Sequence, residues 1–70
     1  MRKYLNHLEE KLYWADYEVQ KMPSGDHKYE MLKIVHSVRN QIISADIKLS
    51  QDKPIDKDLD QIEANLKLIQ

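Results

Sequence analysis

Cysteine is absent from this sequence, glycine occurs once and proline twice. Without cysteine, no disulfide and no thiolate zinc site can stabilise the fold, which suits a reducing compartment. No apolar run approaches the roughly 20 residues of a membrane span, and the N-terminal segment is charged where a signal peptide would be apolar. We therefore expect a cytoplasmic protein without a membrane anchor.

An excess of charge of either sign is also missing. Eleven Lys and Arg stand against twelve Asp and Glu, which gives a net charge of −1 and a pI near 6.3. Proteins that bind phosphate backbones usually carry a basic excess, so nucleic-acid binding is not expected. The many Lys, Ile, Asn, Asp and Gln residues are typical of A+T-rich coding sequences, which indicates a bacterial or phage protein.

The sequence does contain three stretches of apolar residues at alternating steps of three and four. This spacing places each set on one narrow stripe of an α-helix, because 3.5 residues nearly match one helical turn. The first stripe comprises Met1, Leu5, Leu8, Leu12, Ala15, Val19 and Met22. The second comprises Met31, Val35, Val38, Ile42, Ala45 and Leu49, and the third Ile55, Leu59, Ile62, Leu66 and Ile69.

Turn signals divide the chain into three predicted helices, at about residues 2–21, 26–50 and 54–69. Pro23 turns the preceding residue away from helical angles, and Gly25 permits positive φ. Ser24 or Asp26 is expected to cap the second helix through a side-chain oxygen. Pro54 suits the first turn of the third helix, because its missing N–H is not needed there.

These patterns predict one all-α domain over residues 1–70, in which a long antiparallel hairpin and a shorter third helix form a three-helix bundle. A core of this size leaves little stability to spare, so a dimer or other homo-oligomer is expected. The second helix also carries a second apolar strip, rotated by roughly 130° from the first. Its members are Tyr29, Leu32, His36, Ile43 and Ile47. The third helix or a second copy of the chain is expected to cover it.

Three aromatic residues of the first helix point away from its stripe. Tyr13, Trp14 and Tyr17 fall on the opposite side of the helix at 100° per residue. Tyr and Trp often anchor protein interfaces, because they bury a large area and keep a polar tip. Three interpretations stay open: the residues dock a partner protein, the third helix or a helix of a second subunit covers them as ordinary core, or they are partly exposed without a role.

No catalytic or metal-binding motif accompanies the helices. Helical metal pairs usually place His or a carboxylate at i and i+4, but Lys11, Met31 and Asn40 follow the three histidines at that distance. Arg39 lies between the two strips of the second helix, where we expect it to meet an acid such as Asp46 or Glu9. We expect no enzyme activity, metal or cofactor.

The leading functional hypothesis is a small cytoplasmic protein-interaction module that binds another protein through a helical face. The alternatives are a structural, self-associating bundle and a helical DNA-binding regulator. For the regulator, Lys28, Lys33, Arg39 and Asn40 form the only polar cluster with suitable chemistry. The third helix opens with aspartates instead, whose charge repels phosphates. The candidate interface residues are Tyr13, Trp14, Tyr17, Tyr29, Leu32, Ile43 and Ile47.

Overall fold

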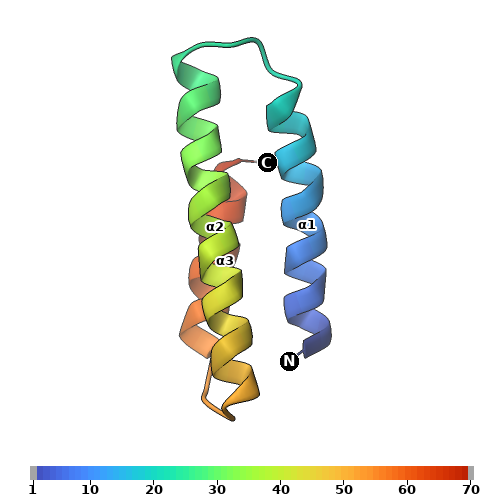
Figure 1. The fold of residues 1–70 in the computed structure, drawn as a ribbon, viewed down its shortest axis with the longest axis vertical. Coiled ribbons are helices and arrows are strands. Elements are labelled where there is room, and N and C mark those ends of the chain that lie inside the picture. The colour runs from blue at the N-terminus through green and yellow to red at the C-terminus, as the bar shows by residue number, and fades with distance from the viewer. Residues whose placement is uncertain (1, 70) are drawn as a thin grey trace.

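A computed structural model describes residues 2–69 and contains three helices and no strand within them (Figure 1). The helices are α1 (Arg2–Gln20), α2 (Asp26–Ser50) and α3 (Asp56–Leu68). The predicted all-α class is confirmed, and the predicted helix ends agree with the structure to within two residues. Helix α3 begins after Pro54 and Ile55, so the proline precedes the helix rather than occupying its first turn.

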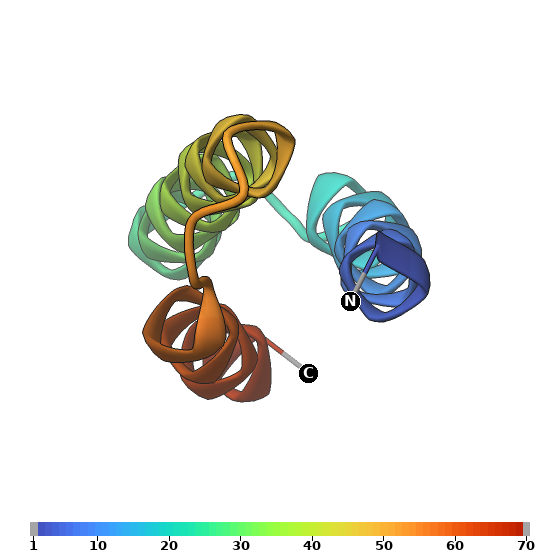
Figure 2. The same cartoon turned by 90° about the horizontal axis from the view of Figure 1, so that it is seen from below.

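The three helices form an elongated bundle of 41 × 17 × 16 Å. Seen end-on, they occupy the corners of a triangle, and α2 packs against both other helices, whereas α1 and α3 contact each other least (Figure 2). Helix α3 is about half as long as α2 and ends short of the hairpin turn (Figure 1). The part of the hairpin nearest its turn therefore extends beyond the third helix.

The three predicted stripes form a single hydrophobic core. Met1 lies outside the described residues, while Met22, Met31, Leu49 and Ile69 pack against the core with partial exposure. The remaining stripe residues are buried, and Val35, Val38, Ala45 and Ile62 are fully inaccessible. These buried residues are Leu5, Leu8, Leu12, Ala15, Val19, Val35, Val38, Ile42, Ala45, Ile55, Leu59, Ile62 and Leu66.

The second apolar strip of α2 is not covered by α3, which corrects one expectation. The polar contacts between α2 and α3 are made from another face of α2. Lys48 Nζ pairs with Asp58 at 3.1 Å, and Asn65 Nδ2 donates to Gln41 Oε1 at 3.0 Å. These part-buried contacts fix α3 beside Gln41 and Lys48. The second apolar strip, which we now call the outer strip, consequently lies on the outside of α2.

Gly25 precedes α2 and has the positive φ that the sequence analysis expected there. Its φ of 159° and ψ of −177° lie in a region essentially restricted to glycine, and its carbonyl accepts a hydrogen bond from Tyr29 N–H at 3.1 Å. No side chain caps the helix, so the predicted capping by Ser24 or Asp26 is wrong. Gly25 itself takes the N-cap position, because Asp26 already belongs to the helix.

The C-terminal end of α2 has a hydrogen-bond pattern that the sequence analysis missed. Asp52 N–H donates to the Leu49 carbonyl at 3.1 Å, and Lys53 N–H donates to the Lys48 carbonyl at 2.9 Å. This pair of bonds is a Schellman motif, which requires a left-handed residue where Asp52 has a φ of 57°. Aspartate tolerates that conformation better than most residues, but glycine is the usual occupant.

Replacing Asp52 tests this turn. We expect Asp52→Gly to raise the free energy of unfolding by about 0.5–1 kcal/mol, because glycine has no Cβ to strain the left-handed backbone. Asp52→Val is expected to lower it by about 1–2 kcal/mol. Urea denaturation monitored by circular dichroism measures both values. Equal stability of the glycine and valine variants would contradict the assigned turn.

Neighbouring isoleucines test the core. Ile42 is 6% exposed and Ile43 is 52% exposed, although they are adjacent and chemically identical. We expect Ile42→Ala to lower the free energy of unfolding by about 2–5 kcal/mol, and Leu12→Ala to do the same, because each leaves a cavity. Ile43→Ala should stay within about 1 kcal/mol of the wild type in the dilute protein. Similar melting midpoints for the two isoleucine variants would refute this register.

Candidate protein-interaction surfaces

The most exposed aromatic surface lies on the outer side of α1. Tyr13, Trp14 and Tyr17, which we call the aromatic cluster, are 65%, 57% and 47% exposed. Neither α2 nor α3 covers them, so the interpretation in which the third helix buries them is wrong for the chain by itself.

The rings of the aromatic cluster contact one another edge to face. The Tyr13 and Trp14 centroids lie 5.5 Å apart with an interplanar angle of 84°, and those of Trp14 and Tyr17 lie 6.0 Å apart at 82°. Edge-to-face pairs are favoured by the ring quadrupoles. Lys21 Nζ lies 4.4 Å from the Tyr17 centroid, which adds a cation–π contact at the end of the row. The cluster is therefore an ordered row of rings rather than three independent side chains.

Trp14 borders an open hollow beyond the end of α3. The hollow measures about 450 Å³ and is lined by Lys11, Trp14, Ala15, Glu18 and Ile69. It lies beyond the C-terminal end of α3, which ends at Leu68. One side of the hollow is apolar, and a lysine and a glutamate lie at its edge. Sequence reasoning missed this hollow, since only the length of α3 relative to the hairpin indicates it.

Tyr13 borders a groove between α1 and α2. Two adjoining hollows of about 330 and 190 Å³ make up this groove, and both are lined by Glu9, Ile42 and Ile43. The outer strip of α2 runs along the same side: Tyr29, Ile43 and Ile47 are 61%, 52% and 53% exposed. His36 is also exposed, whereas Leu32 is half-buried and packs against the core.

Ion pairs cross this groove. Arg39 Nη2 lies 3.2 Å from Asp16 Oδ2, and Arg2 pairs with Asp46. Arg39 was expected to meet Asp46 or Glu9, so its acid partner is corrected to Asp16, which lies about two helical turns beyond Glu9 on α1. Each ion pair is partly exposed and contributes little to stability. They do leave the groove with charges of both signs already paired.

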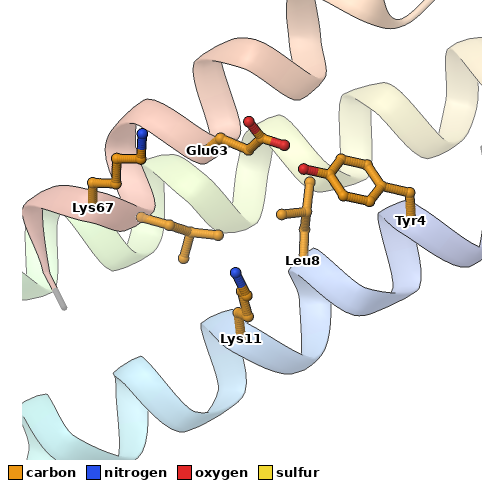
Figure 3. Close-up of a pocket in the computed structure, with 6 residues that line it drawn as sticks. Tyr4, Leu8, Lys11, Glu63 and Lys67 are labelled. Atoms are coloured by element: carbon orange, nitrogen blue, oxygen red, sulfur yellow. The ribbon is translucent and has the colours of Figure 1, made fainter.

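A fourth hollow, of about 210 Å³, lies between α1 and α3 (Figure 3). The Tyr4 hydroxyl and the Glu63 carboxylate point toward one another at one side, and Lys11 and Lys67 lie at the other (Figure 3). Tyr4 and both lysines are exposed. Within residues 2–69 no polar or charged side chain is buried. The hollow thus lacks the water-excluded surroundings in which catalytic electrostatics are strongest.

The histidines lie apart on the surface. His7 and His27 are exposed, as is His36, and the described residues contain no group of three His, Cys, Asp or Glu side chains placed to hold a metal ion. His7 lies 6.4 Å from the Tyr4 ring in a tilted arrangement.

The basic residues suggested for DNA contact mostly have protein partners. Lys28 donates to the Gln20 carbonyl at 3.1 Å, Lys33 lies 3.7 Å from Glu30, and Arg39 is paired with Asp16. The first turn of α3 carries Asp56 and Asp58. No helix within the described part of the chain is both long and apolar enough to cross a membrane.

The exposure of Trp14 leads to a spectroscopic prediction. In the dilute protein we expect its fluorescence to peak at the long wavelength of a hydrated indole and to be quenched by acrylamide. Trp14→Ala should change the free energy of unfolding by less than about 1 kcal/mol, because the side chain lies outside the core. The exposed Tyr29→Ala variant is a matched control for removal of an aromatic ring. A blue-shifted, unquenchable indole would show that the cluster is buried.

Comparison with known proteins adds no relative: no protein-family model, no curated protein and no solved structure matches this chain.

Proposed function

We propose that this chain is a small protein-interaction module and that the aromatic cluster of α1 is its docking surface. The observation that carries the proposal is the exposed, edge-to-face row of Tyr13, Trp14 and Tyr17, which neither α2 nor α3 covers. Monomeric proteins rarely expose such a patch without an interaction partner. Tyr and Trp are also the residues that most often dominate binding energies in protein interfaces.

The rigidity of the cluster supports this role. All three residues lie on a continuous helix that is anchored by buried residues such as Leu12 and Ala15 on its other side. Their rings already contact one another, so little side-chain freedom is lost when a partner binds. A preordered surface of this kind binds without first reorganising its own backbone.

The surroundings of Trp14 indicate the chemistry of the partner. The 450 Å³ hollow beside the indole has an apolar wall formed by Ala15 and Ile69. We propose that the partner inserts a bulky apolar side chain there, carried on an amphipathic helix that lies along α1. Hydrogen-bond acceptors next to that side chain would pair with the indole N–H and the tyrosine hydroxyls. The proposed place of this encounter is the cytoplasm of a bacterial or phage-infected cell.

Site-specific photocrosslinking tests the docking surface. A photoreactive phenylalanine analogue at position 17 is expected to capture one defined protein in the cell that produces this chain, because position 17 adjoins Trp14 in the row. The same analogue at Lys57, which is exposed on α3, is the matched control and should not capture it. The crosslink should disappear when Trp14→Ala is added.

Binding of the captured protein can then be measured directly. We expect Trp14→Ala to weaken it by about 30-fold or more, which corresponds to about 2 kcal/mol, while the folded fraction stays unchanged. Tyr29→Ala should leave the affinity nearly intact. Capture that is equal at positions 17 and 57, or that survives the loss of Trp14, would refute the aromatic cluster as the docking surface.

A further inference from the structure

We infer that the outer strip of α2, together with the groove between α1 and α2, is the contact surface of a homodimer with an antiparallel two-fold arrangement. This surface shares only Tyr13, which lines the groove, with the proposed docking surface. Its ridge is formed by residues such as Tyr29, Ile43 and Ile47, whereas Trp14 lies toward the end of α3, on the other side of α1. Substitutions at Trp14 and substitutions at Ile43 and Ile47 therefore test the two proposals separately.

The proposed contact surface is complementary to itself. At 100° per residue, the strip residues Tyr29, Leu32, His36 and Ile47 all lie within about 40° of Ile43, so they form one ridge along α2. Immediately beside this ridge runs the groove, which is lined by Leu12, Tyr13 and Ile42. A two-fold axis places the ridge of each copy in the groove of the other, as ridge-into-groove packing requires. A ridge and a groove on the same face suit a second copy of the chain.

The exposed area of this surface also favours a second copy. At about 200 Å² for a large side chain, the exposed fractions of Tyr13, Tyr29, Ile43 and Ile47 amount to on the order of 450 Å² of mainly apolar surface. Standard stable interfaces bury about 800 Å² per partner, and roughly half of that area is apolar. The polar residues that border the groove supply the remainder. The area thus matches a dimer of modest affinity.

The charges of the groove also favour a second copy. Two ion pairs, Arg39 with Asp16 and Arg2 with Asp46, line the groove together with Glu9, so its charges nearly balance and do not select a strongly acidic or basic partner. A parallel two-fold arrangement would set Lys33 against its own copy, which is repulsive. An antiparallel arrangement about the middle of the strip avoids this repulsion. It also brings Tyr29 opposite Ile47 of the partner subunit.

Molar mass in solution tests the dimer. We expect the wild-type chain to pass from monomer to dimer over micromolar concentrations in sedimentation equilibrium. The double variant Ile43→Lys/Ile47→Lys is expected to stay monomeric over the same range, with an unchanged helical circular dichroism spectrum. Leu68→Lys, a matched control at a residue 62% exposed on α3, should dimerise like the wild type. A monomeric wild type, or a dimer that tolerates both lysines, overturns the proposal.

Disulfide trapping tests the arrangement, because the natural chain has no cysteine. An oxidised mixture of Tyr29→Cys chains and Ile47→Cys chains should yield the crosslinked heterodimer, since the two positions lie opposite each other. Each variant alone should remain largely uncrosslinked. Efficient self-crosslinking of either variant alone would overturn the antiparallel arrangement. Trp14→Ala should leave the dimer intact, so loss of partner capture in that variant and loss of the dimer in the lysine variant are separate results.

Discussion

The burial of the α2 stripe against both other helices is the interaction on which the rest of the structure depends. Val35, Val38 and Ala45 are completely inaccessible, because α1 covers them from one side and, along its shorter length, α3 from the other. Helix α2 is therefore the central element, and the contacts between α1 and α3 are secondary. With no disulfide and no buried polar group in the described residues, this apolar contact supplies most of the stability.

The same packing of the apolar stripes determines which side chains remain on the surface of the bundle. Once Leu8, Leu12 and Ala15 point toward α2 and α3, helical geometry directs Tyr17 almost directly away from the core. The side chains of α2 that face neither neighbour are likewise fixed by the register of Val38 and Ile42. Both proposed interaction surfaces are thus consequences of how a narrow apolar stripe is packed. The short α3 adds a hollow beside Trp14, because it ends before the hairpin turn.

The hairpin and all three core stripes were predictable from spacing alone, because a step of three and four residues has one structural meaning in a helix. The face of α2 that receives α3 was not predictable in this way. It is chosen partly by Lys48 with Asp58 and Asn65 with Gln41, and hydrophobic periodicity does not register such polar pairs. The outward direction of Tyr13 and Tyr17 followed from helix geometry. Whether another helix covers them depends on where α3 ends in space.

The central claim is that the outer faces of α1 and α2 are accessible surfaces, separate from the core, on which partners assemble. Paramagnetic relaxation by a soluble gadolinium chelate, recorded by NMR for every side chain, measures this most directly. At high dilution the account predicts strong broadening for the Trp14 indole and the Ile43 and Ile47 methyl groups, and none for Val38 or Ile62. With rising protein concentration, Ile43 and Ile47 should become protected while Leu68 stays exposed. Protection of Trp14 and Ile43 at the lowest concentration would contradict the account.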